Sequence, residues 1–139
     1  MATKGTVQSL NINDLKRYSP QARVNAPLLD SNDLVTRMNC YEPGQVTPLH
    51  MHPDDDEVIF CVEGRGAITF EQRDAVPLSP GSLVSLPAGL THGIEAAADC
   101  RMVVIYTTNA GYSTVRASQQ GAATSTIRLP GERSGATND

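Results

Sequence analysis

Short segments with apolar residues at alternate positions recur along the middle of the chain. Successive side chains of a β-strand point to opposite faces, so this period of two predicts strands. The sequence LVTRMNCY at 34–41 alternates in this way, and CRMVVIYT at 100–107 is rich in the β-branched residues that strands favour. Further extended segments are expected at 45–52, 57–62, 67–71 and 81–87, with a short piece around His92.

Glycine and proline separate these segments, as in the runs Glu42-Pro43-Gly44 and Gly64-Arg65-Gly66. No convincing helical pattern lies between the strands, so there are no crossover helices to support a parallel sheet. The pattern therefore predicts an antiparallel all-β fold, either a sandwich or a barrel.

The length of 139 residues indicates one domain with a real core. Residues 1–33 are polar and are expected to form an arm that lies across the domain or across a second subunit. Residues 34–108 carry the strand pattern and are taken as the core of a β-barrel. Residues 109–139 are expected to be a C-terminal extension, partly disordered from about residue 130 or ordered against a partner subunit.

Charge and composition exclude several classes of function. The net charge is −4 and the basic residues are scattered, so no nucleic-acid partner is expected. No stretch reaches the ~20 apolar residues of a membrane span, and the N-terminus has no signal-peptide pattern. Three widely spaced cysteines suit a reducing compartment better than a disulfide framework. A cytoplasmic protein without a membrane partner is expected.

All three histidines fall in two stretches, GQVTPLHMHPDDDEVIFCVEG at 44–64 and GSLVSLPAGLTH at 81–92. His50 and His52 are two positions apart and face the same way on a strand, and Glu57 follows five residues later. We predict that His50, His52, Glu57 and His92 bind one metal ion. The alternative is that these histidines are structural or merely exposed.

The first stretch resembles the first cupin motif, G-xxxxx-H-x-H-xxxx-E-xxxxxx-G, at every fixed position. The second resembles the second motif, G-xxxxx-P-x-G-xx-H-xxx-N, except that Ala96 stands where the pattern has Asn. That Asn is not a metal ligand in the family pattern. The resemblance implies a single-domain cupin, an antiparallel jelly-roll β-barrel with the metal inside.

Three imidazoles and one carboxylate suit a divalent transition metal, one per chain. Fe or Mn is favoured because the resemblance is to a family rich in such enzymes, and Zn, Ni, Co and Cu also fit this ligand set. Four protein ligands leave up to two positions of an octahedral ion open for water, dioxygen or substrate. The acidic run at 54–56 is interpreted as a solvated turn rather than as further ligands.

The strand phase suggests which side chains accompany the metal. If Glu57 points inward, Ile59 and Cys61 do too. In 100–107 the inward set is expected to be Met102, Val104 and Tyr106, because the other set would bury the charge of Arg101.

The inward face of 34–41 stays open, so both Met38 and Arg37 are candidates for the substrate pocket. Arg37 could anchor a carboxylate substrate, although a surface position is the commoner role of an arginine. Tyr106 could offer its hydroxyl to a substrate, and Glu57 could act as a base as well as a ligand.

The outward positions Val58, Phe60 and Val62 are also apolar. An apolar outer face needs cover from the N-terminal arm or from another subunit. On this ground we predict a homodimer.

The residues leave three functions open. The favoured one is a metal-dependent dioxygenase acting on a small organic molecule, held on the metal as an enolate or diol. The second is a metal-assisted lyase, isomerase or cyclase, in which Glu57 or Tyr106 transfers the proton. The third is a cupin that binds a small ligand without catalysis.

Removing one ligand tests the metal site directly. The metal content of the purified protein should fall sharply in His50→Ala and in His92→Ala, because each variant deletes one of four donors. Elemental analysis measures the metal, and circular dichroism checks that the fold is retained. A folded variant that keeps stoichiometric metal would refute the assignment.

Overall fold

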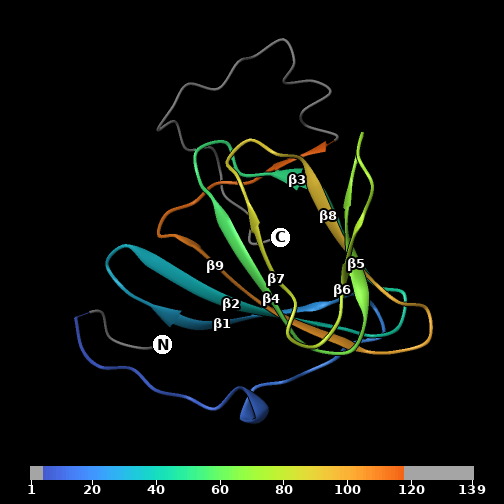
Figure 1. Cartoon of the computed structure of the whole chain (residues 1–139). Helices are drawn as coiled ribbons and strands as arrows, with labels where there is room; N and C mark the ends of the chain where they lie inside the picture. The colour runs from blue at the N-terminus through green and yellow to red at the C-terminus, as the bar shows by residue number, and fades with distance from the viewer. Residues whose placement is uncertain (1–4, 118–139) are drawn as a thin grey trace.

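The computed structural model describes residues 5–117. Two antiparallel sheets face each other and close into a barrel (Figure 1). The first sheet, in spatial order, contains β1 (Val24–Asp30), β2 (Leu34–Tyr41), β9 (Met102–Asn109), β4 (Glu57–Glu63) and β7 (Leu83–Leu86). The second contains β10 (Val115–Arg116), β3 (Val46–Met51), β8 (His92–Ala96), β5 (Gly66–Phe70) and β6 (Val76–Leu78).

The chain repeatedly crosses from one sheet to the other, so strands next to each other in space are often far apart in sequence. Strand β9 lies between β2 and β4, and β8 lies between β3 and β5. All of the pairings are antiparallel, which makes the fold a jelly-roll. The predicted all-β jelly-roll is confirmed.

The inner faces of the two sheets form the main core. The alternation of buried and exposed residues along β4 places Ile59 and Cys61 inside and leaves Val58 and Phe60 outside, as the sequence pattern predicts. The members are mostly aliphatic, because the chain holds few aromatic residues. The buried core residues are Tyr41, Ile59, Cys61, Ile68, Leu78, Leu86, Ile94, Ala96, Met102, Val104 and Tyr106.

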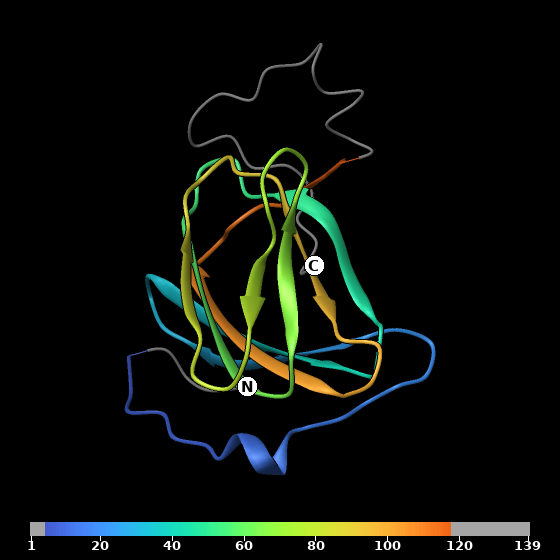
Figure 2. The same cartoon turned by 45° about the vertical axis from the view of Figure 1, so that its right-hand side comes forward.

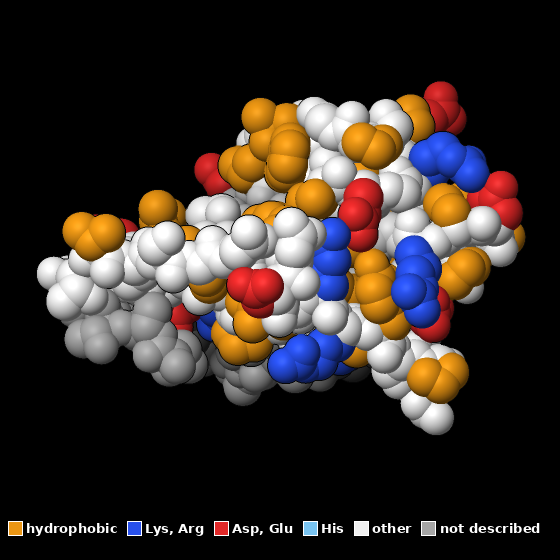
Figure 3. Space-filling model, turned by 90° about the horizontal axis from the view of Figure 1, so that it is seen from below, with side chains coloured by type: hydrophobic (Ala, Val, Ile, Leu, Met, Phe, Trp, Pro, Cys, Tyr) orange, Lys and Arg blue, Asp and Glu red, His pale blue; other side chains and the backbone are white. Residues whose placement is uncertain are grey.

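A second apolar cluster lies on the outer face of the first sheet. Met38, Cys40 and Val103 are fully buried there under the N-terminal segment, which contributes Leu15 and Tyr18. The segment passes below the barrel and carries one 3₁₀ turn, η1 (Ile12–Asp14) (Figure 2). Seen from below, apolar side chains alternate with charged ones on this face (Figure 3). The expected arm therefore covers its own domain over part of this face.

The structure corrects two predictions made from the sequence. The boundary at residue 34 comes too late, because residues 24–30 form β1 and pair along β2 in the first sheet. Met38 does not line the interior: it packs outward, while its neighbours Asn39 and Tyr41 are the inward residues of β2. Propensity alone did not reveal β1, since its sequence VNAPLLD contains a proline and little alternation. The disorder predicted from about residue 130 concerns residues outside those described.

The cysteines form no disulfide: Cys40 and Cys61 are buried and Cys100 is partly exposed. Among residues 5–117 there is no helix long and apolar enough to span a membrane.

Two motif glycines differ in role, although both have positive φ. Gly64 passes so close to the Arg101 carbonyl that any Cβ would collide with it, whereas the space beside Gly44 is open.

Candidate metal centre

The four predicted ligands converge from both sheets at one end of the barrel. His50 on β3 and His92 on β8 are direct cross-strand partners in the second sheet. His52 follows immediately after the end of β3, and Glu57 opens β4 in the first sheet. Strand pairing within one sheet and the facing of two sheets thus bring together residues separated by up to 42 positions (92 − 50).

The donor atoms lie within reach of one ion. One ring nitrogen from each of the three histidines lies within 4.8 Å of the other two. His92 Nε2 is 3.0 Å from Glu57 Oε1, and His52 Nε2 is 3.7 Å from Glu57 Oε2. Each histidine is 2% exposed and Glu57 is 4% exposed, so water satisfies little of this polar cluster.

A main-chain carbonyl fixes the orientation of each imidazole. Nδ1 of His50 is 2.7 Å from the Pro48 oxygen, and Nδ1 of His92 is 2.9 Å from the Leu90 oxygen. Nδ1 of His52 is 2.9 Å from the Ser113 oxygen. A carbonyl oxygen can only accept, so each Nδ1 carries the proton and donates it. Each Nε2 is thereby left with a lone pair.

These lone pairs and the Glu57 carboxylate are all hydrogen-bond acceptors, so a positive charge among them would stabilise the cluster. His92 Nε2 faces a carboxylate oxygen that is itself an acceptor, and two acceptors at 3.0 Å repel unless a cation or an extra proton lies between them. His52 Nε2 is buried and has no hydrogen-bond partner. A divalent ion bound by the three Nε2 atoms and Glu57 satisfies every one of these groups, so the residues fit a metal.

The pKa shifts of Glu57, His52 and His50 are consistent with a site that binds a cation. Burial would raise the pKa of Glu57, but the contacts with His52 and His92 outweigh burial and lower it to about 2, so the carboxylate is ionised. Burial lowers the pKa of His52, yet the Glu57 carboxylate more than compensates and the net shift is upward. Burial, reinforced by His92, lowers the pKa of His50 to about 3, which keeps this imidazole neutral and able to coordinate.

The segment after β9 completes the site, and nothing in the sequence pattern pointed to it. Besides the Ser113 carbonyl, Thr114 places its Oγ1 3.3 Å from His52 Nδ1. The ring of Tyr112 packs edge-on against the His52 ring, with the centroids 5.3 Å apart. β10 then pairs with β3 beside His50. The Ser113 contact is made by a main-chain atom and leaves no residue signature, so no sequence pattern could predict it.

The acidic turn before Glu57 was predicted to be solvated, but two of its residues make hydrogen bonds to other parts of the chain. Asp55 is 1% exposed and accepts a hydrogen bond from Asn109 Nδ2 at 3.1 Å. Asp56 accepts from the Ala88 N–H, and its own carbonyl accepts from Thr108. The turn is therefore not simply solvated: it ties the β3–β4 and β7–β8 connections together at the metal end of the barrel.

A buried polar network runs across the interior from the metal centre. The Tyr106 hydroxyl accepts from Asn25 at 2.9 Å and lies 3.5 Å from the Tyr112 hydroxyl. Asn25 also donates to Asn39 at 2.8 Å. Burial raises the pKa of both Tyr106 and Tyr112, so both phenols stay protonated at neutral pH and can donate hydrogen bonds.

The remaining predicted pocket residues take different positions. Ile59 lies one inward position after Glu57 on β4, opposite Tyr106. Cys61 and Met102 lie deeper, in the apolar core, and the Cys61 thiol faces the carbonyls of Glu63 and Gly64. Arg37 stands opposite Tyr106 in the pairing of β2 with β9, and its side chain is 11% exposed.

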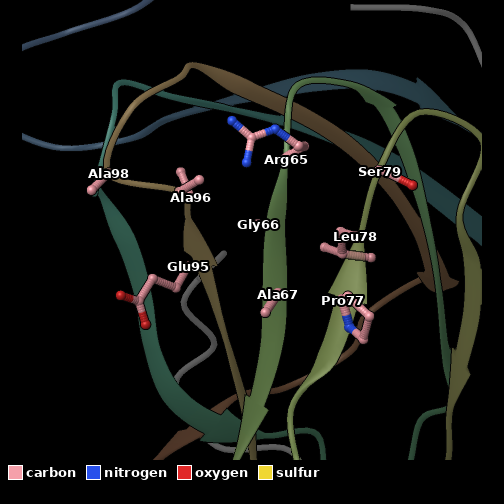
Figure 4. A pocket seen from close by; sticks show the side chains of 10 residues that line it. Arg65, Gly66, Ala67, Pro77, Leu78, Ser79, Glu95, Ala96 and Ala98 are labelled. Carbon is pink, nitrogen blue, oxygen red and sulfur yellow. The ribbon is translucent and has the colours of Figure 1, made fainter.

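An open depression on the outer side of the second sheet is distinct from the metal centre. It has a volume of about 440 Å³ and is lined by β5, β6 and the end of β8 (Figure 4). Its one basic side chain, Arg65, is paired with Asp99 at 2.9 Å, and most of its walls are alanine, proline and glycine. None of the four predicted ligands lines it, so it does not compete with the metal centre as the reactive site.

Comparison with known proteins agrees with this geometry. The family model described as "Cupin domain" matches residues 37–106, which is half of the chain and includes all four predicted ligands. A segment of 58 residues is 38% identical to the acireductone dioxygenase of Bacillus velezensis. That match covers 39% of this chain and 33% of the relative, so the chain spans about a third of the length of the curated relative it matches.

Solved structures share the fold at low identity. An RmlC-like cupin protein from Desulfovibrio desulfuricans superposes with a TM-score of 0.68 at 24% identity, covering 75% of this chain and 97% of the other. The polyketide cyclase RemF from Streptomyces resistomycificus gives a TM-score of 0.69 at 16% identity, covering 81% and 86%. These likenesses establish the architecture and carry no information about the reaction.

Acid should destabilise the metal-free protein through His50. Its pKa is about 3 in the folded chain against 6.5 ordinarily, so between these values the unfolded chain binds more protons than the folded one. The free energy of unfolding should therefore fall as the pH drops below 6.5, by up to about 1.4 kcal/mol per pH unit. The lowered pKa of Glu57 adds to the loss below 4.5. The raised pKa of His52 acts above pH 6.5, where it makes the folded state less stable as the pH rises, so it does not change the slope at lower pH.

Urea unfolding in the presence of a chelator, at intervals from pH 7.5 to 4.5, measures this slope. The matched variant His50→Gln is neutral throughout and should show a flatter dependence between pH 6.5 and 4.5. Equal slopes for the two proteins would show that His50 is not the group responsible.

Proposed function

The chain belongs to the cupin family, and on that premise we propose that it is a metal-dependent enzyme acting on a small organic molecule, with an oxygen-dependent dioxygenase as the favoured activity. The observation that carries the proposal is the convergence of three Nε2 lone pairs and an ionised carboxylate in a buried cluster. We favour Fe or Mn as the ion. A bound ion of this kind would supply Lewis acidity and, if redox-active, access to dioxygen.

The protein's own groups have definable tasks in such a reaction. Glu57 is ionised and can accept a proton from a substrate hydroxyl through whichever carboxylate oxygen is not engaged. Tyr106 keeps its proton and can donate it as a hydrogen bond to a substrate oxygen. Tyr112 lies between Tyr106 and His52, so it is placed to orient a molecule bound beside the histidine cluster. The burial of all four ligands limits competing hydrolysis by water.

The partial match to an acireductone dioxygenase supports a substrate that binds through two neighbouring oxygens, such as an enediol or a β-diketone. Such molecules lose a proton on binding a divalent ion, which is the step that Glu57 can assist. A lyase, isomerase or cyclase would use the same chelate without oxygen, and a binding protein would leave the molecule intact.

Oxygen consumption separates these activities. Protein purified without chelator is analysed for metal, then loaded with Fe(II) or Mn(II) and mixed with acireductone or acetylacetone. We expect dioxygen uptake in step with substrate loss in air, and no substrate loss without air. Substrate loss in the absence of oxygen would instead identify non-redox chemistry, and binding without loss would identify a binding protein.

Two carboxylate variants control this experiment. Glu57→Gln should abolish turnover, since it removes both a ligand and the base. Glu95→Gln alters an exposed carboxylate on the outer side of β8 and should leave turnover unchanged. Equal losses in both variants would indicate a general effect of the charge change rather than a role for Glu57.

We further propose that the chain forms a homodimer through the uncovered part of the outer face of the first sheet. Phe60 and Leu83 are paired across β4 and β7 and are 40% and 69% exposed, and Val58 on the same face is 40% exposed. The N-terminal segment covers the neighbouring cluster but not these side chains. Burying them against a second copy would remove apolar surface from water.

Sedimentation equilibrium tests the dimer. The unmodified protein should sediment at twice the chain mass, and Phe60→Glu should shift it towards the monomer, because the glutamate charge would be buried in the interface. Val46→Glu is the control, since Val46 is 47% exposed on β3 of the other sheet. A monomer before substitution, or equal effects of the two substitutions, would contradict the proposal.

A further inference from the structure

Arg37 has an unusual position for an arginine. Its side chain is 11% exposed on the inward face of β2, among the residues of the barrel interior. Its Nε is buried and has no hydrogen-bond partner. A buried N–H without a partner destabilises the folded protein, and more so on a charged group, so an acceptor bound at this atom would remove that cost.

The partner that Arg37 does have holds the guanidinium in one orientation. Nη1 donates to Asp30 Oδ1 at 2.9 Å and approaches the Thr36 carbonyl at 3.4 Å. Among residues 5–117, no hydrogen bond of Arg37 uses Nε or Nη2. These two nitrogens form one edge of the planar group, with parallel N–H bonds. That edge matches the two oxygens of a carboxylate, which is the bidentate geometry arginine favours.

The strand register relates the position of Arg37 to that of Glu57. Arg37 is opposite Tyr106, and two positions further along the same sheet Val35 is opposite Thr108, which is opposite Glu57. Two residues along a strand and two strand spacings across give a Cα separation of roughly 12 Å between Arg37 and Glu57. Both side chains extend from the same face of the sheet, so both belong to the wall that faces the barrel interior. Tyr106 lies on β9, the strand between β2 and β4, and its hydroxyl is 3.5 Å from that of Tyr112.

We propose that the Nε–Nη2 edge of Arg37 binds a carboxylate of the substrate while the other end of the substrate reaches the metal centre. The substrate is then a short molecule with a metal-chelating pair of oxygens at one end and a carboxylate at the other. This inference rests on the proposed function, since it uses the same metal centre. Asp30 balances the charge of Arg37 in the absence of substrate and holds Nη1, which leaves Nε and Nη2 for the carboxylate.

A matched pair of small molecules tests whether Arg37 binds a carboxylate, which we call the Arg37 anchor, and the test needs no turnover. Acetylacetone and acetylpyruvate share one β-diketone unit and differ by a terminal methyl against a carboxylate. Each is titrated calorimetrically into Co(II)-loaded protein with air excluded, and the visible cobalt bands report binding at the metal. The unmodified protein should bind acetylpyruvate about 10- to 100-fold more tightly, the range expected of hydrogen bonds to a charged group.

Substitutions at Arg37 should remove this preference and leave the affinity for acetylacetone unchanged. Arg37→Gln should abolish it, and Arg37→Lys should keep only a part, because lysine retains the charge and loses the two-pronged edge. Asp30→Asn combined with Arg37→Gln avoids an unpaired buried carboxylate and should behave like Arg37→Gln. Arg65→Gln, at an exposed ion pair, should keep the full preference.

The possible failures are distinguishable. If acetylacetone does not bind the cobalt-loaded protein, the proposed function fails and the anchor with it. If both probes bind equally, or if Arg37→Gln keeps the preference, the anchor is overturned while the metal chemistry stands. Competition by inorganic phosphate that is stronger than competition by acetate would overturn the assignment to a carboxylate.

Discussion

Three imidazoles that each give their Nδ1 proton to a main-chain carbonyl have no choice about where their second nitrogen points. In this barrel one ring nitrogen of each histidine lies within 4.8 Å of the other two, and the Nε2 atoms of His52 and His92 face the Glu57 carboxylate, in a buried region. Such a cluster is electrostatically incomplete, because it contains acceptors and no donor between them. A cation would remove the repulsion between these acceptors. The jelly-roll holds the acceptors close together, because they are attached to paired strands and to facing sheets.

The two sheets divide the work of building this centre. The second sheet sets His50 against His92 through strand pairing, and the first sheet contributes Glu57 from the opposite wall. The segment after β9 then orients His52. The first sheet also carries Arg37 and Tyr106 side by side, so the wall facing the histidines holds the groups suited to a substrate. The three histidines and the proposed substrate contacts Arg37 and Tyr106 therefore belong to different sides of the barrel, with Glu57 on the same sheet as the latter.

The alternation of apolar residues was sufficient to predict antiparallel strands, because side-chain direction in a strand has a period of two. The resemblance to the two cupin motifs implied the jelly-roll and the grouping of His50, His52, Glu57 and His92. Alternation was insufficient for β1, whose proline and weak alternation conceal a strand that is defined by its pairing with β2. The inward face of β2 could not be chosen either, since both of its faces are buried, one by the barrel and one by the N-terminal segment. The contribution of Ser113 was invisible because it is made by a main-chain atom.

The use of carbonyls to orient the imidazoles has a consequence for how the protein can diverge. A side-chain carboxylate in that role would be lost by one substitution, whereas the oxygens of Pro48, Leu90 and Ser113 are present whatever side chain occupies those positions. Substitutions at these three positions therefore leave the acceptors of the imidazoles in place, provided that the path of the backbone is unchanged. Residues beside the metal can change to suit a new substrate while the centre itself persists.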